Sequence, residues 1–400
     1  MQFYKIFWSG MICLFLLNGC AFFNSEEDVI TLSPLPEVKN QFTLHPLWST
    51  SVGRGIGEYY SRLRPVGNDK SLFVADRNGW VKSLNLDTGK VIWQTNLSQK
   101  TGFISIKNDS AMLSGGLTVD GDLVYVGSEH AILFALNASD GSVVWKTQVA
   151  GEVLSRPIIS SYLILIHTGN GMIQAINKTN GSIYWTLNLD VPTLSLRGES
   201  DPAISSSGTA VFGGENGRVS AVTIDKGQLI WQQVISEVRG STEIERIKDV
   251  DMRPIIVDGI VYAAAYNGNF VALQLNSGEI LWKCNLGSVN DLTIHAGYIY
   301  LVDQNDQLIA LTSDTGIPVW KQSDLLHRGL TAPVIYNGYL VVGDSEGYLH
   351  WLNAEDGRFV TQQEVNRSGF LGAPIEISGK LIIQARNGTV YSFVQKYMTD

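Results

Sequence analysis

A segment repeated along the chain constrains its fold more than any other feature of the sequence. Each copy has a first turn, usually Asn-Gly, then a short alternating strand, a second turn of the Asp-x-Gly or Thr-Gly kind, and a Trp. Six copies are complete (76–93, 128–145, 168–185, 214–231, 266–282, 304–320) and two are degenerate (345–361, 385–393). Asn-Gly favours a type I′ turn with two positive-φ residues, and the second turn requires a left-handed Gly. The pattern predicts a series of β-hairpins.

Two further strands precede each hairpin, and the first of them often opens with proline. Proline is tolerated at the first residue of a strand, where no ladder donor is needed. These openings are Pro65, Pro157, Pro202, Pro254, Pro333 and Pro374. Units of four short strands that recur every 38 to 52 residues are typical of β-propeller blades, and a solenoid is the structural alternative.

The two ends of the chain favour a closed ring. The last copy stops at Phe393 without a Trp strand, whereas residues 44–49 hold a Trp-centred strand with no hairpin before it. Each end therefore carries the half that the other lacks. We predict an all-β fold over residues 44–400, an eight-bladed β-propeller of four-stranded antiparallel blades whose last blade is closed by the N-terminal strand.

In five copies the Trp follows a fixed spacing, Ala-x5-Gly-x3-Trp, as in Ala135, Gly141 and Trp145, and the copy that ends at Trp93 has Ser83 in place of the Ala. Ala and Gly leave flat backbone on which an indole from a neighbouring blade can stack and bury much of its surface. The spacing resembles the docking motif of quinoprotein-type (PQQ-like) propeller repeats. We expect structural docking by Trp48, Trp93, Trp145, Trp185, Trp231, Trp282 and Trp320.

The N-terminal segment has the pattern of a secretory signal. An apolar run from Ile6 to Leu17 follows Lys5 and ends in Leu-Asn-Gly-Cys, which resembles the bacterial lipobox. The run is too short to span a membrane; a buried helix ending at a Gly-Cys turn is the alternative. We expect a signal peptide at 1–19, lipidation of Cys20 and a tether over 20–43. Residue 21 is Ala and not the Asp that favours inner-membrane retention in enterobacterial lipoproteins. The resemblance to these lipoproteins therefore implies an outer-membrane, lipid-anchored protein that faces the periplasm.

Composition and motifs argue against two large classes of function. The net charge of −9 and the absence of a basic run disfavour nucleic-acid binding. The six His residues have no metal-ligand spacing, and we expect each of them on a loop or rim. After signal removal and lipidation only Cys284 is left, so the adjacent cysteines of quinoprotein dehydrogenases are missing. We predict no enzyme activity, no metal and no cofactor, with a quinone-dependent dehydrogenase as the rival hypothesis.

Most connections between repeats are short, and two neighbouring ones are longer. Trp185 to Pro202 takes 17 residues and Trp231 to Pro254 takes 23, against 12 from Trp145 to Pro157. Being of one connection type, they should emerge side by side on one face. They carry Leu194, Leu196, Arg197, Asp249 and Asp251. Leucines beside an arginine suit a protein-binding hot spot, but leucines folded under their own loop and a local salt bridge fit equally well.

Several stretches taken together resemble the BamB family, the lipoprotein subunits of the outer-membrane β-barrel assembly (BAM) machine. They are Asn-Ser-Glu-Glu-Asp (24–28), Leu-Ser-Leu-Arg-Gly-Glu-Ser (194–200), Gly-Ser-Thr-Glu-Ile (240–244), Asp-Val-Asp (249–251) and 342–351. The resemblance implies a scaffold that docks on the periplasmic POTRA domains of BamA through Leu194, Leu196, Arg197, Asp249 and Asp251. It implies a part in folding and inserting β-barrel proteins. Direct binding of unfolded substrates by strand addition is a further alternative.

Overall fold

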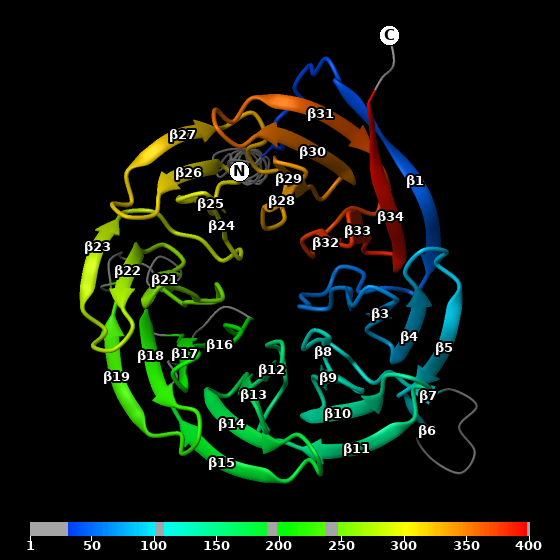
Figure 1. Ribbon diagram of the computed structural model, residues 1–400, viewed down its shortest axis with the longest axis vertical. Helices are drawn as coiled ribbons and strands as arrows, with labels where there is room; N and C mark the ends of the chain where they lie inside the picture. Colours follow the sequence, from blue (N-terminus) through cyan, green and yellow to red (C-terminus); the bar gives the residue numbers. More distant parts are fainter. Residues whose placement is uncertain (1–30, 101–107, 190–197, 216, 237–246, 398–400) are drawn as a thin grey trace, which may run out of the picture.

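The described residues of the computed structural model form an eight-bladed β-propeller without a helix, as predicted (Figure 1). The structure describes residues 31–100, 108–189, 198–215, 217–236 and 247–397. Eight four-stranded antiparallel sheets surround a central axis, and a two-stranded sheet of β6 (Gln99–Lys100) and β7 (Asn108–Asp109) stands beside them. Within these residues no helix is long or apolar enough to cross a membrane.

Each blade runs outward from a short innermost strand. Blades 1 to 4 consist of β2 (Val66–Gly67), β3 (Ser71–Ala75), β4 (Trp80–Asn85) and β5 (Val91–Asn96); β8 (Thr118–Asp120), β9 (Leu123–Ser128), β10 (Ile132–Asn137) and β11 (Val143–Gln148); β12 (Ile158–Ile159), β13 (Leu163–Thr168), β14 (Met172–Asn177) and β15 (Ile183–Asn188); and β16 (Ala203–Ile204), β17 (Thr209–Gly213), β18 (Arg218–Thr223) and β19 (Leu229–Val234).

Blades 5 to 7 repeat this order, and blade 8 takes its outermost strand from the other end of the chain. They consist of β20 (Ile255–Val257), β21 (Ile260–Ala264), β22 (Phe270–Gln274) and β23 (Ile280–Cys284); β24 (Thr293–His295), β25 (Tyr298–Val302), β26 (Leu308–Thr312) and β27 (Pro318–Gln322); β28 (Val334–Tyr336), β29 (Tyr339–Gly343), β30 (Tyr348–Asn353) and β31 (Phe359–Glu364); and β32 (Ile375–Ile377), β33 (Lys380–Gln384), β34 (Thr389–Tyr397) and β1 (Phe42–Ser51).

The first turn of the repeat is not the type I′ turn that Asn-Gly predicts. At residues 78–79 the positive φ falls on Gly79 (127°) and not on Asn78, and at 387–388 it falls on Gly388 (87°). The carboxylate of Asp76 accepts the amides of Gly79 and Trp80 at 2.9 and 2.8 Å. In blade 1 this aspartate closes a longer turn in which only the Gly needs the left-handed region. At 267–268 the positive φ falls on Asn267 alone (47°), so none of these three turns has the two consecutive positive-φ residues that the dipeptide predicted.

The ring closes where the sequence predicts, because β1 pairs with β34 in an antiparallel register that sets Trp48 opposite Ser392. Figure 1 shows the blue β1 along the red β34. The chain also contacts the ring before β1: the Ser33 amide donates to the Leu326 carbonyl at 3.0 Å, and Gln41 to that of Val360 at 3.1 Å. The last part of the expected tether is therefore held against blade 7.

Neighbouring blades are joined by tryptophan. The indole ring of each repeat lies on the second-turn Gly of the next blade, where a Cβ would collide with it. Each Nε1 also donates to a backbone carbonyl of that blade, at 2.7 to 3.2 Å. The donor and acceptor pairs are Trp48–Leu86, Trp93–Ala138, Trp145–Lys178, Trp185–Ile224, Trp231–Leu275, Trp282–Ser313 and Trp320–Ala354.

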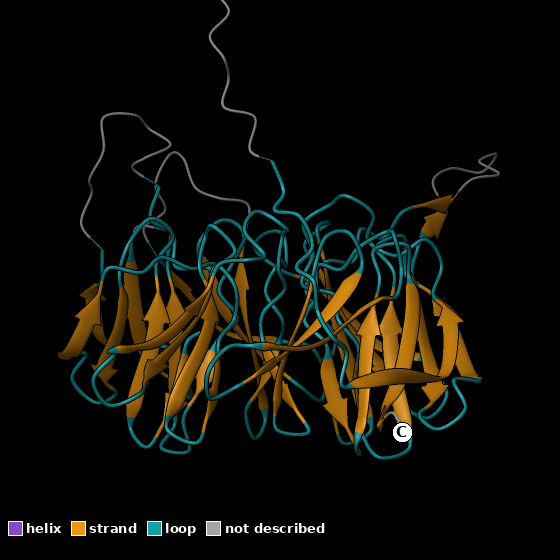
Figure 2. Cartoon of the chain, turned by 90° about the horizontal axis from the view of Figure 1, so that it is seen from above, coloured by secondary structure: helices purple, strands orange, loops and turns teal. Residues whose placement is uncertain are grey.

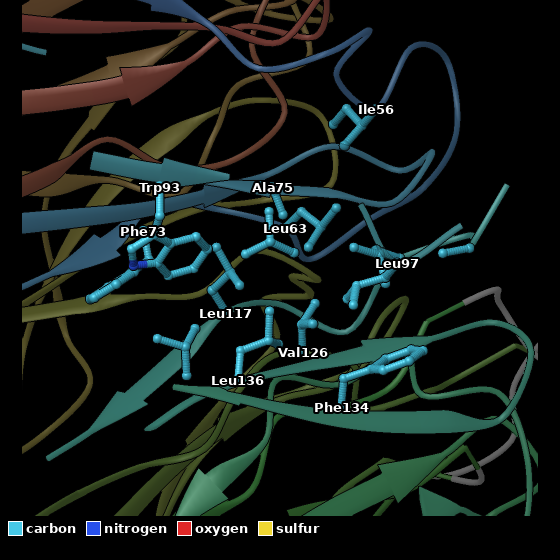
Figure 3. Close-up of a cluster of buried hydrophobic side chains, with 14 residues drawn as sticks. Ile56, Leu63, Phe73, Ala75, Trp93, Leu97, Leu117, Val126, Phe134 and Leu136 are labelled. Carbon is cyan, nitrogen blue, oxygen red and sulfur yellow. The ribbon is translucent and has the colours of Figure 1, made fainter. Parts of the chain in front are cut away.

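Hydrophobic side chains fill the wedges between blades, as Figure 3 shows for blades 1 and 2, with Phe73 and Trp93 facing Leu117 and Leu136.

The joint between blades 7 and 8 departs from the pattern of tryptophan docking. There Trp351 takes the usual Ala position and Thr361 the usual Trp position. Phe42 packs edge-on against Trp351 with ring centroids 6.0 Å apart, and its amide donates to Thr361 Oγ1 at 3.3 Å. The N-terminal strand therefore forms this joint as well.

Candidate functional site

The two long connections meet over blades 4 and 5. Of the first the structure describes the end at 198–202, and of the second the end at 247–254. The Ser200 hydroxyl donates to the Met252 carbonyl at 3.2 Å, and a Cβ on Gly198 would lie 3.1 Å from the Asp251 carboxylate. The described ends are thus in direct contact, on the face crossed by the connections between successive blades (Figure 2).

The predicted partner-binding residues fall into two groups. Leu194, Leu196 and Arg197 lie outside the described residues, as does the expected lipidation site Cys20. Asp249 and Asp251 are described, and both are buried, with 1% and 6% of their surface exposed. Their carboxylates therefore lie beneath the surface of this face. Charged residues in a long connection had favoured exposed positions for both of them.

Burial changes the protonation of Asp251. It raises the pKa of this carboxyl from 3.8 to about 6, against the opposing effect of the Arg62 guanidinium. Arg62 also donates to the backbone carbonyl of Asp251. At neutral pH the folded chain therefore keeps a buried carboxylate that would be more stable in water.

We expect Asp251→Asn to be more stable than the wild type near neutral pH. The folded state binds the Asp251 proton more tightly than the unfolded chain does, so the contribution of this group to stability falls as the pH rises from about 4 to about 6. The amide removes that loss, and the gain should be roughly 1–3 kcal/mol above pH 7. Urea midpoints of the wild type and of Asp251→Asn, measured above pH 7 and below pH 4, test the expectation. It fails if the difference between the two midpoints is as large below pH 4 as it is above pH 7.

A second set of buried polar groups supports the same connection and was missed by the sequence analysis. The Glu199 Oε2 atom lies 3.2 Å from His167 Nδ1, and both side chains are 2% exposed. Burial lowers the pKa of His167 to about 4, whereas burial and the neighbouring Glu215 raise that of Glu199 well above its usual range. Both shifts favour the neutral forms, so this contact is not an ion pair between two charged groups.

The expectation that every His lies on a loop or rim was wrong for two of them. His167 belongs to β13 and His350 to β30, and both are buried. These middle strands of a blade are buried along most of their length, and a carboxylate lies near each imidazole: Glu199 faces His167, and Asp344 Oδ2 lies 3.2 Å from His350 Nε2. Spacing along the chain carried no signal for His167, since Glu199 is 32 residues away in the connection to the next blade.

The described residues offer little for catalysis. No three of their His, Cys, Asp or Glu side chains gather as a metal site requires. The thiol of Cys284 is partly buried, and burial raises its pKa to about 11. A thiol with so little thiolate at neutral pH is a poor nucleophile.

Comparisons with known proteins agree with this architecture. The family model described as outer membrane protein assembly factor BamB matches residues 77–322. Assembly factors BamB of Yersinia pestis and Escherichia coli are 63% and 58% identical over 99% of this chain and their whole length. The crystal structure of BamB from Moraxella catarrhalis superposes with a TM-score of 0.78 at 25% identity, covering 88% of this chain and 100% of that one.

An enzyme shares the fold at a greater distance. A quinohemoprotein alcohol dehydrogenase from Comamonas testosteroni superposes with a TM-score of 0.69 at 14% identity, covering 89% of this chain and 78% of its own. At that identity the likeness concerns the propeller alone. Since a family model matches more than half of the chain and the relatives match it end to end, the chain belongs to the BamB family of outer membrane protein assembly factors.

Proposed function

We propose that this chain is a non-enzymatic scaffold of the outer-membrane protein assembly machinery that docks on the periplasmic POTRA domains of BamA. The observation that carries the proposal is the contact between two long connections of successive blades, in a chain of this family. Loops held by a rigid scaffold are where binding surfaces usually lie. Leu194, Leu196 and Arg197 are the contact residues in this proposal.

Asp249 and Asp251 act as positioning residues in the same proposal. Their burial removes them from direct contact with a partner, but Asp251 lies against Gly198, the residue after Arg197. A buried carboxylate at this point fixes where the first connection leaves the ring. Substitution of Asp251 should therefore weaken docking less than substitution of Arg197.

The lipid anchor belongs to the same proposal. Cys20 carries the lipid, and Ser33 is held by the Leu326 carbonyl in the connection between blades 6 and 7. This connection crosses the same face as the two long ones, and Figure 2 shows the described start of the chain rising from that face. Thirteen residues reach at most about 45 Å, so the docking face would stay close to the periplasmic side of the outer membrane.

Two variants test the docking surface. Arg197→Ala and Leu194→Asp should each abolish co-purification with BamA from detergent-solubilised membranes and leave the thermal melt nearly unchanged, because truncating a hot-spot residue typically costs about 2 kcal/mol or more of binding. Arg358→Ala and Ile317→Asp are matched controls at exposed positions outside the two connections. Wild-type recovery of BamA by both loop variants would place the docking surface elsewhere.

Direct contact with unfolded substrates is a second candidate, favoured by one observation. The outermost strands of blades 1 to 4 begin with exposed apolar pairs such as Val143 and Val144, which are 44% and 48% exposed. An outermost strand also has one unpaired edge, where an extended segment can add by β-augmentation. Crosslinking from these strands to nascent barrel proteins separates this function from docking on BamA.

A further inference from the structure

The repeat places one residue of every blade at the same position near the central axis, two residues before the innermost strand begins. Around the ring these eight residues are Arg64, Gly116, Arg156, Asp201, Arg253, Asp291, Ala332 and Ala373. Five of them are charged and three are small. The charges therefore gather on one axis from blades that are far apart in the sequence.

Most of these charges are paired with one another. Asp201 accepts the Arg156 amide at 2.6 Å, and the Arg156 Nε lies 3.6 Å from its second oxygen. Asp291 accepts the Arg253 amide at 3.1 Å and Arg62 Nη1 at 3.2 Å. Burial opposes ionisation of Asp291, but the surrounding arginines outweigh it and lower its pKa to about 2. Both aspartates are thus engaged by donors already in place.

Among the described residues, two guanidinium groups of this set lack a close carboxylate: that of Arg253, whose Nε is buried without a hydrogen-bond partner, and that of Arg64, which lines a cavity. Arg64 is the one that a ligand could reach. The nearest carboxylate oxygen is Asp291 Oδ2, at 3.9 Å from Arg64 Nη1, which is too long for a hydrogen bond. The ring positions on either side of it are Ala373 and Gly116, so neither adjacent blade offers it a carboxylate there. Burial and the nearby Arg156 lower the pKa of Arg64 to about 10. This guanidinium would gain from an added anion.

A cavity of about 350 Å³ lies against Arg64, which is within the range of small-molecule sites. One side of it is polar and carries Tyr60, Arg62 and Arg64 beside the carboxylates of Asp201, Asp251 and Asp291; the other is apolar and formed by Val289, Ala332, Leu371 and Ala373. The small residues at ring positions 332 and 373 leave this space open. A ligand that fits both sides has one anionic end and a short hydrocarbon part.

We propose that this axial cavity binds a small organic carboxylate. The planar carboxylate meets the Arg64 guanidinium, a pairing in which two parallel N–H···O bonds form. The carbon part lies on the methyl groups of Ala332 and Ala373. Arg62 and Arg64 line the cavity beside three aspartates (201, 251, 291), and the charges of Arg156 and Arg253 act on the same aspartates from outside the lining. One added negative charge therefore balances the whole group, whereas inorganic phosphate brings excess charge and nothing for the apolar wall.

Benzoate is a suitable probe, followed by saturation-transfer NMR and calorimetry on the full mature chain. We expect millimolar binding by the wild type, and an affinity lower by roughly tenfold or more in Arg64→Gln, since charged hydrogen bonds are lost. Ala373→Val, which fills the cavity and keeps every charge, should weaken binding too. Arg358→Ala, at an exposed turn, is the matched control and should bind as the wild type does.

Three results would overturn the proposal. They are absence of benzoate binding at tens of millimolar, equal binding by wild type and Arg64→Gln, and phosphate binding at the same site as tightly as benzoate. A thermal melt of each variant shows whether it is folded. Because Arg64 and Ala373 line the axis, and the connections 186–201 and 235–253 carry the docking proposal, failure here leaves the recovery of BamA unaffected.

Discussion

A chain lacking residues 44–52 is expected to lose the closed ring and to unfold far below the wild-type midpoint. These residues contain most of β1, whose pairing with β34 completes blade 8. Their removal exposes the edge of β34 and takes away the buried side chains of Leu44 and Trp48. Truncating one large core side chain costs about 2–5 kcal/mol, and the whole stability of a protein is about 5–15 kcal/mol.

The deletion also acts on both neighbours of blade 8. Trp48 lies on Gly89 of blade 1 and donates to the Leu86 carbonyl, so the joint with blade 1 is lost. Phe42, next to the deletion, is held against Trp351 of blade 7 by the same strand. A single segment therefore supports two of the eight joints, and without it blade 8 keeps only the contacts of its inner strands with blade 1, such as the hydrogen bond from Gln384 Nε2 to the Ala75 carbonyl.

Circular dichroism melts and limited proteolysis measure this effect. The control is His45→Ala combined with Ser49→Ala, which alters two exposed positions of the same strand and should leave the midpoint within a few degrees of the wild type. A synthetic peptide of residues 42–51 added to the truncated chain should restore protection from protease. A truncated chain that melts as the wild type does would show that closure by β1 contributes little.

The ring could be predicted from the sequence because its determinants are local. Turn glycines, strand alternation and the Trp after each second turn lie within one repeat, and the unmatched halves near Trp48 and Phe393 gave the closure. The joint between blades 7 and 8 could not be predicted, since Trp351 and Thr361 break the pattern and Phe42 replaces it from the opposite end of the chain.

The candidate site was predictable only in part. The two connections were chosen by length, and their described ends do meet, but length alone does not single them out, because the connection from β5 to β8 is longer than either. The burial of Asp249 and Asp251 was not visible, because charged residues in a long connection suggest solvent, whereas the chain here returns to the axis. The contact of Arg62 with Asp291 joins residues 229 positions apart, and no periodicity records such a pair.

Asp344→Ala is expected to cost about 3–5 kcal/mol, the usual effect of removing one partner from a buried ion pair. Arg328 Nε donates to Asp344 Oδ2 at 2.8 Å, and the two side chains are 3% and 0% exposed. Burial acts to raise the pKa of Asp344, but hydrogen bonds from His350, the Tyr348 amide and Arg328 outweigh it and hold the pKa below its usual value. Without this carboxylate, the remaining acidic partner of Arg328 among the described residues is Glu346, which is half exposed.

The same guanidinium connects this pair to the N-terminal tether, because Arg328 Nη1 donates to the Ser33 carbonyl at 2.9 Å. Asp344→Ala should therefore also release residues near Ser33, and cleavage by protease before β1 should become faster. Asp303 provides a matched control at the same turn of blade 6, where it accepts the amides of Asn305 and Gln307. Among the described residues, the Asp303 carboxylate accepts from these two amides and from no arginine, unlike that of Asp344.

Asp303→Ala should accordingly cost only about 1 kcal/mol, the net contribution of ordinary hydrogen bonds. Urea midpoints of the two variants at neutral pH give the comparison. Since the folded pKa of Asp344 is lowered, its contribution is present above pH 4 and is lost as the pH falls further, so the wild type and Asp344→Ala should converge in acid. Equal losses in the two alanine variants at neutral pH would mean that the aspartate only closes a turn and that the buried arginine does not depend on it.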